Sequence, residues 1–130
     1  MSNEDKIERP SIPTAEVNDF TSPEERFQNE TLRPIIKMKH DLLIAFFNHT
    51  LILKKNHYFK ISEDKKSDYI KSIFNKDLQF RNQLKGIIVG QFTTGEFKIY
   101  RNFSSALNKR IIAIVLERVL THLNELREEI

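Results

Sequence analysis

The stretch SPEERFQNETLRPIIKMKHDLLIAFF, residues 22–47, decides the fold class because it begins and ends as a helix yet contains Pro34. Ser22 predicts the N-cap, Pro23 suits the first helical position, and Glu25 completes a capping box. Apolar residues recur at threes and fours on both sides of Pro34, which is typical of a helix. The open question is whether Pro34 kinks one helix or separates two.

Pro34 weakens the helix, but none of the usual helix-ending residues accompanies it. Its ring removes one backbone hydrogen bond, clashes with the carbonyl of Glu30 and disfavours helical geometry at Arg33. Because no glycine lies nearby, a kink within one helix from residue 22 to about residue 55 is slightly favoured over a full break. We interpret the kink as a corner of the fold, without a motif that indicates a site.

Length and composition favour one helical domain. The chain has 130 residues, of which 39% are hydrophobic, ten are phenylalanine and only three are glycine. Scarce glycine disfavours a fold with many tight turns, and the absence of cysteine excludes disulfides, thiolate metal sites and a cysteine nucleophile. The longest apolar runs, at 42–47 and 111–116, fall far short of the roughly 20 residues of a membrane span. We therefore expect a cytoplasmic protein that does not enter membranes.

Charge divides the chain into an arm, residues 1–21, and a helical domain, residues 22–130. The arm contains Pro10 and Pro13, lacks periodicity and has a net charge of −3, so the remainder carries +6. These features predict an extended or disordered arm. An acidic arm could contact the basic body or compete with an anionic partner, although a solubilising role is favoured.

Two further helices follow the connection NHYFKIS, residues 56–62. Ser62 is the predicted N-cap of the first, and Asp77 is the predicted N-cap of the second, which continues toward Gly90. Their buried faces are predicted to contain the following apolar residues, spaced three and four apart: Tyr69, Ile70, Ile73 and Phe74, then Leu78, Phe80, Leu84, Ile87 and Ile88.

The stretch KGIIVGQFTTGEFKIY, residues 85–100, allows two interpretations. As strands, IIV and FKIY would flank a TTGE turn and form a hairpin. As a helix, Thr93 caps and Glu96 closes a second capping box. A lone hairpin is marginal in water and the rest of the chain offers no partner strand, so the helix is favoured.

The last helix is predicted to begin at Ser104 or Ser105 and to reach the end of the sequence. Apolar residues from 112 to 130 are spaced 4, 3, 4, 3 and 4 apart, which is a heptad seam. Such a seam packs either on a groove of its own domain or against a twin helix, and from it we expect a homo-oligomer such as a homodimer. The predicted interface residues are Leu116, Val119, Leu123, Leu126 and Ile130.

Polar residues gather in YRNFSSALNKR, residues 100–110, around the predicted start of the last helix. A helix N-terminus with arginines can hold a phosphate or carboxylate. A capped corner whose arginines pair with acids such as Glu96 is the favoured alternative. The candidate anion-binding residues are Arg101, Asn102, Asn108, Lys109 and Arg110.

No catalytic, metal or cofactor site is predicted. The four histidines, His40, His49, His57 and His122, do not pair with one another at helical spacing, and HExxH and GxSxG are absent. Nucleic-acid binding through residues 94–120 is disfavoured, because residues 111–116 are too apolar for a recognition helix.

Three segments, PEERFQNETLRPIIKMKHDLL, GQFTTGEF and SSALNKR, resemble a family of small, uncharacterised bacterial proteins, some of which are labelled glyoxalase. The resemblance spans about residues 22–120 and favours a helix at residues 93–101. Glyoxalase I enzymes hold their metal with His and Glu on the strands of βαβββ modules, so no catalytic residue is carried over.

Together these patterns predict an all-α, single-domain bundle of four to five helices, the first of them kinked near Pro34. The leading functional hypothesis is a cytoplasmic, homo-oligomeric protein that binds another protein or a small anion. The alternatives are a small glyoxalase-like lyase with a site lined by His and Arg, and a nucleic-acid-binding protein.

Overall fold

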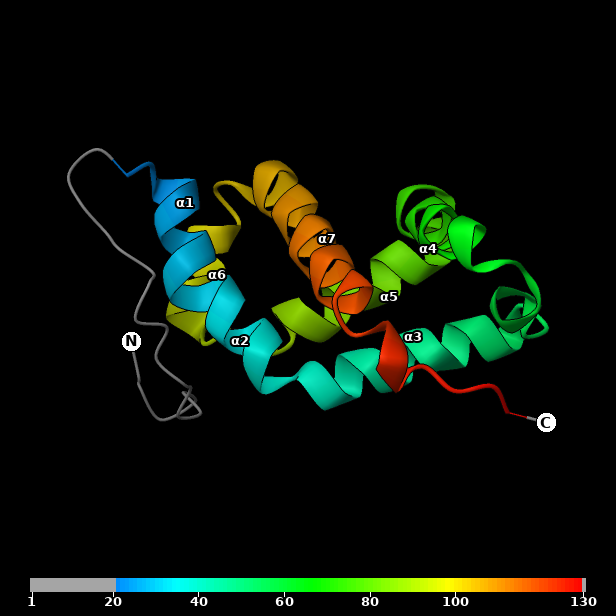
Figure 1. The fold of residues 1–130 in the computed structure, drawn as a ribbon. Helices are drawn as coiled ribbons and strands as arrows, with labels where there is room; N and C mark the ends of the chain where they lie inside the picture. The colour runs from blue at the N-terminus through cyan, green and yellow to red at the C-terminus, as the bar shows by residue number, and fades with distance from the viewer. Residues whose placement is uncertain (1–20, 130) are drawn as a thin grey trace.

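The computed structural model describes residues 21–129, where helices joined by short turns and loops are present and no strand is, which confirms the all-α class (Figure 1). It contains more helices than the predicted four to five, because the first and last predicted helices are each divided. The arm predicted at 1–21 lies outside the described residues except for Thr21. The elements are α1 (Pro23–Phe27), the π-helical turn η1 (Gln28–Leu32), α2 (Arg33–Met38), α3 (His40–Leu53), the 3-10 turn η2 (His57–Lys60), α4 (Glu63–Lys76), α5 (Leu78–Val89), α6 (Thr94–Tyr100), α7 (Ser104–Leu120) and the 3-10 turn η3 (Leu123–Glu125).

Pro34 lies inside continuous helical structure, because a π-helical turn precedes it. The backbone N–H of Arg33 donates to the carbonyl of Gln28, five residues back instead of four. This wider turn accommodates the proline ring, which would clash with the Glu30 carbonyl in a regular α-helix. Ser22 caps the start as predicted, and its hydroxyl accepts from the N–H of Glu25 at 3.1 Å.

The chain changes direction at Lys39, five residues after the proline. Lys39 has φ −96° and ψ 18°, outside the helical region, and it separates α2 from α3. Figure 1 shows α3 leaving at an angle to α2. The predicted kink near Pro34 is thus displaced to Lys39, because the π-helical turn absorbs the proline and the packing of α3 sets the bend.

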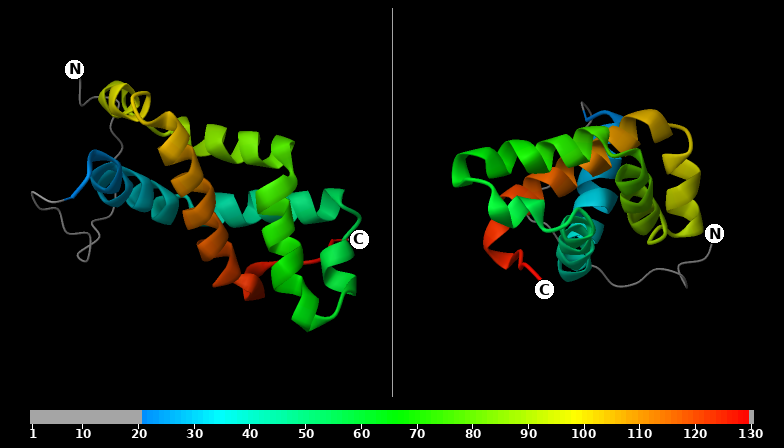
Figure 2. Two further views of the ribbon diagram at one scale, coloured as in Figure 1. Left: turned by 90° about the horizontal axis from the view of Figure 1, so that it is seen from above. Right: turned by 90° about the vertical axis from the view of Figure 1, so that its right-hand side faces the viewer.

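The longest helix, α7, runs through the middle of the molecule, between α1–α2 on one side and α4 on the other (Figure 2). It packs against α2, α4 and α5. Its buried residues lie on one broad face of the helix: Leu107, Ile111, Ile112, Val115 and Val119.

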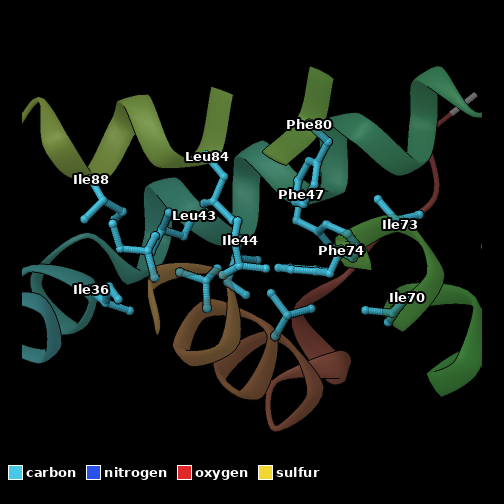
Figure 3. Packing of buried hydrophobic residues seen from close by; sticks show 14 of the residues in the cluster. Ile36, Leu43, Ile44, Phe47, Ile70, Ile73, Phe74, Phe80, Leu84 and Ile88 are labelled. Carbon is cyan, nitrogen blue, oxygen red and sulfur yellow. The ribbon is translucent and has the colours of Figure 1, made fainter. Parts of the chain in front are cut away.

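An aromatic cluster joins α3, α4 and α5 (Figure 3). Phe74 packs with Phe47 at a ring-centroid distance of 5.2 Å and with Phe80 at 4.9 Å, while Phe46 stacks on Phe80 at 5.3 Å. Phe47 and Phe74 are almost fully buried. The predicted buried faces of α4 and α5 supply most of the core residues of these helices. Leu78 is the exception at 68% exposed, because it lies at the first position of α5, at the corner with α4.

Residues 85–89 and 94–100 are helical and a short turn joins them, which confirms the favoured interpretation over a hairpin. Both hydrogen bonds of the second capping box are present, from the N–H of Thr93 to Glu96 Oε1 at 2.9 Å and from the N–H of Glu96 to Thr93 Oγ1 at 3.1 Å. Asp77 caps α5, as predicted, by accepting from the N–H of Phe80 at 3.0 Å. At α7 the predicted serine cap is wrong, since Phe103 holds the N-cap position without a side-chain bond.

The prediction that the last helix runs to residue 130 is wrong, because α7 ends at Leu120. Side chains that follow the helix bind its last carbonyls: Thr121 Oγ1 donates to the carbonyl of Glu117 at 3.2 Å, and His122 Nδ1 lies 2.7 Å from the carbonyl of Arg118. The Glu117 carbonyl also keeps its backbone bond from the N–H of Thr121, whereas the His122 ring takes the place of the His122 N–H at the Arg118 carbonyl, because that N–H donates to Val119 instead.

After α7 the chain continues as a C-terminal segment, residues 121–129, which includes η3 and runs along α3 (Figure 1). The side-chain amide of Asn48 binds the backbone of Arg127 twice, donating to its carbonyl at 2.9 Å and accepting from its N–H at 2.8 Å. Asn56 Nδ2 donates to the carbonyl of Glu129 at 2.7 Å. Leu126, only 5% exposed, anchors the segment in the core.

Replacing Phe74 with Ala should remove the centre of the aromatic cluster and lower the free energy of unfolding by about 3–5 kcal/mol. This loss is a large part of the roughly 5–15 kcal/mol typical of a domain. Urea denaturation followed by circular dichroism measures it. Phe97→Ala, at a phenylalanine that is 45% exposed, is the control and should cost far less. Equal losses for the two variants would contradict the assigned core.

Asp77 should make stability sensitive to acid. The N–H of Phe80 and then the ammonium of Lys54, 2.9 Å away, hold the pKa of the Asp77 carboxyl below its usual range. A lowered pKa in the folded state means stabilisation that is complete above the ordinary carboxyl pKa of about 4 and is lost as pH falls through the lower folded value. Asp77→Asn keeps a capping oxygen but removes the charge.

Urea denaturation between pH 2 and 7 should therefore show wild type more stable than Asp77→Asn at neutral pH, with the difference disappearing as the pH falls through the lowered pKa of Asp77. Asp68→Asn removes an exposed carboxylate of α4 and should follow the wild-type curve. If Asp77→Asn also follows it, the assigned role of Asp77 is incorrect.

Candidate metal centre

Three side chains with metal-ligating atoms meet where α3 begins and α7 ends. His40 is the first residue of α3, His122 follows the end of α7, and Glu125 lies in η3. One ligand atom from each lies within 4.8 Å of those of the other two. The histidine rings contact each other at a centroid distance of 4.5 Å. Both histidines are half-buried and the Glu125 side chain is 37% exposed, so ions have access from solvent.

Both ring nitrogens of His40 have partners. Arg118 Nη1 lies 3.1 Å from Nδ1, and Nε2 lies 3.0 and 3.1 Å from the two carboxylate oxygens of Glu125. A guanidinium can only donate, so Nδ1 accepts, and the proton of the neutral ring is on Nε2, from which it is donated to Glu125. His40 therefore links a cation to an anion as a neutral imidazole.

His122 has the tautomer that a metal ligand needs. Its Nδ1 lies 2.7 Å from the carbonyl of Arg118, which can only accept, so the proton is on Nδ1. The lone pair of Nε2 is left for a metal. Histidine ligands usually donate their other N–H to a carbonyl or carboxylate in this way, which fixes the orientation of the ring.

Two imidazoles and one carboxylate form a ligand set for a divalent transition metal. Zinc binds such nitrogen and oxygen donors, and three protein ligands leave a position for water or another molecule. Calcium and magnesium prefer oxygen donors alone. To hold a metal through Nε2, His40 would have to carry its proton on Nδ1, which would then no longer accept from Arg118. A metal would therefore be held at the expense of the Arg118–His40 bond.

The five predicted anion-binding residues differ in their environment. Two of them are engaged within the chain, because the hydroxyl of Tyr100 donates to Asn108 at 2.6 Å and Arg110 donates to Gln28 Oε1 at 2.8 Å. These bonds hold α7 to α6 and to η1. Anion binding around the start of α7 stays a prediction, and its exposed residues are Arg101, Asn102 and Lys109.

The predicted oligomer interface lies partly in the core of this chain. Val119 is fully buried and Leu126 is 5% exposed, while Leu116 and Leu123 are half-buried against the core. Ile130 lies outside the described residues. The described part of the seam thus packs on its own domain, which is one of the two arrangements that such a seam allows.

The sequence contained one signal of the metal-ligand cluster that was missed. His122 and Glu125 are three residues apart, a spacing used by helical metal sites, although in the structure both lie beyond the end of α7. No sequence pattern indicates His40, which is 85 residues from Glu125. The bend at Lys39, five residues after the corner predicted at Pro34, places His40 at the start of α3, beside the end of α7.

No family model, curated protein or solved structure matches this chain. The resemblance to proteins labelled glyoxalase thus stays a prediction. In the described residues, no helix has both the length and the apolar character needed to cross a membrane. The fold and the cluster together define a small all-α protein with a His–His–Glu site between helix ends.

Proposed function

We propose that this chain is a binding protein that holds one divalent transition-metal ion through His40, His122 and Glu125. The observation that carries the proposal is the convergence of their ligand atoms within 4.8 Å. The tautomer of His122 and the orientation of Glu125 toward His40 further support it. The donor types favour zinc, nickel or copper over calcium or magnesium.

A metal in this position would fasten the C-terminal segment to α3. His40 belongs to α3, whereas His122 and Glu125 belong to the segment that Asn48 already binds further along. Because the folded structure brings these ligands together from α3 and from the C-terminal segment, the metal would bind the folded chain better than the unfolded chain. Metal at 100 times its dissociation constant would then stabilise the fold by about 2.7 kcal/mol.

Purified protein treated with chelator should bind about one equivalent of Zn²⁺ in isothermal titration, and its melting temperature should rise by roughly 10 °C at saturating metal. His122→Ala and Glu125→Gln each remove one ligand and should weaken binding at least tenfold. His49→Ala, an exposed histidine on the same helix as His40, should bind like wild type.

Circular dichroism establishes that each variant is folded. Wild-type protein that neither binds Zn²⁺ nor gains stability would refute the proposal, as would equal weakening by His49→Ala.

A metal-dependent lyase is the alternative from a different class, and the open coordination position expected of a three-ligand site favours it. A turnover assay with methylglyoxal and glutathione on zinc- and nickel-loaded protein separates the two. Metal binding without turnover supports a binding protein, and turnover abolished by His122→Ala supports the enzyme.

Self-association is a second candidate function, and an exposed apolar face favours it. Leu53 and Leu78 are 69% and 68% exposed beside a groove of about 300 Å³ between α3 and α5. Lys54 and Asp77, the charged residues that line this groove, neutralise each other at 2.9 Å. A neutral face allows two copies of a basic chain to approach, so the expected occupant is a second copy.

Light scattering at two protein concentrations should give twice the chain mass, and Leu53→Lys with Leu78→Lys should give the mass of one chain. The introduced lysines of the two copies would face each other in a symmetric interface, and their repulsion is the reason why the dimer is expected to dissociate. Ile99→Lys, at an apolar residue of α6 that is 48% exposed, is the control and should remain a dimer. A wild-type monomer at every concentration would exclude this candidate.

A further inference from the structure

A second feature lies beside the metal-ligand cluster, where the start of α2 faces the end of α7. It is a cleft of about 130 Å³. Arg33 approaches from α2, and the other residues belong to α7 or to the turn that follows it. The lining residues are Arg33, Ile114, Glu117, Arg118, Thr121 and His122.

Two arginines from different helices line the cleft, Arg33 of α2 and Arg118 of α7. Within residues 21–129, the side chain of Arg33 has no hydrogen-bond or ion-pair partner. Arg118 uses Nη1 to bind Nδ1 of His40, and its other N–H groups are left for a ligand. Both arginines are half-buried, so their charges are less screened than those of fully exposed side chains. Glu117 is an opposing charge, at an exposed position of α7.

We propose that this cleft binds a small oxyanion, either a carboxylate or a tetrahedral anion of the phosphate and sulfate type. Guanidinium groups match both geometries, because each can offer two parallel N–H donors to the oxygens of one anion. The volume sets the size of the ligand. Because each water occupies about 30 Å³ in the liquid, the cleft has room for a single small anion, and it is below the roughly 300 Å³ at which drug-sized sites begin.

The cleft adjoins the metal-ligand cluster: His122 belongs to both, and Arg118, which lines the cleft, is bonded to His40 of the cluster. When Nε2 of His40 binds a metal, Nδ1 takes up the proton and Arg118 loses its acceptor, so its guanidinium is free to turn fully to the anion. Metal and anion should therefore strengthen each other's binding by the same factor. This coupling rests on the proposed metal binding, whereas the oxyanion site itself does not.

The site is tested on the metal-free full-length chain by isothermal titration with sodium sulfate and with sodium acetate at constant ionic strength. Arg33→Gln should weaken binding of the preferred anion about five- to tenfold. Lys37→Gln removes the same charge one turn along α2, at an exposed residue outside the cleft, and should change the affinity less than twofold. Glu117→Gln removes the opposing charge and should strengthen binding.

Stronger binding of sulfate assigns the site to tetrahedral anions, and stronger binding of acetate assigns it to carboxylates. Circular dichroism and thermal unfolding establish that Arg33→Gln is folded. The site is refuted if neither anion binds wild-type protein at 50 mM or below, at the weak end of the affinities expected of a specific site. It is also refuted if Arg33→Gln and Lys37→Gln weaken binding equally, which would indicate only general attraction to a basic surface.

Repeating the titration with zinc-loaded protein tests the coupling. Tighter anion binding than in the metal-free chain supports it, and unchanged binding to zinc-loaded protein refutes the coupling while the oxyanion site stands. If the chain takes up no zinc, the proposed metal binding and the coupling both fail, and the metal-free result still decides the oxyanion site.

Discussion

The change of direction at Lys39 is the constraint on which the rest of the structure depends. Without it, α3 would continue along the axis of α2 and would not pack with α4 and α5 in the aromatic cluster around Phe74. It would also not present Asn48 to the C-terminal segment. The bend therefore determines both the core contacts of α3 and the position of His40 at its start.

The end of α7 has a structural and a chemical role that depend on the same atoms. His122 bonds to the carbonyl of Arg118 through Nδ1, which replaces a backbone bond of the helix. The same bond leaves the lone pair on Nε2 and holds the ring against His40, at a centroid distance of 4.5 Å. A local solution to unpaired helix carbonyls thus also orients a potential metal ligand.

The sequence predicted features whose causes are local and missed those whose causes are distant. The caps at Ser22, Asp77 and Thr93 were predicted because each depends on residues three positions apart. The end of α7 at Leu120 was missed because residues 121–130 contain no glycine or proline, and the contact that holds them elsewhere comes from Asn48, 79 residues away.

The metal-ligand cluster was missed for the same reason, apart from the spacing of His122 and Glu125. The bend at Lys39 has no helix-breaking residue of its own, and the proline that suggested a kink lies in a continuous helical stretch. The bend and the metal-ligand cluster both result from the packing of the whole domain, which the spacing of apolar residues along the sequence does not reveal.

Both ring nitrogens of His40 already have hydrogen-bond partners among the described residues, and these bonds limit the affinity that the site can have for a metal ion. Its Nδ1 accepts from Arg118 and its Nε2–H donates to Glu125, so a metal ion must replace good hydrogen bonds instead of filling an empty ligand set. Net affinity is then the difference between coordination and the bonds given up. A ligand that offers the released guanidinium of Arg118 a new acceptor reduces that cost. The adjoining cleft, where Arg33 approaches from the other side, is where such a ligand would bind.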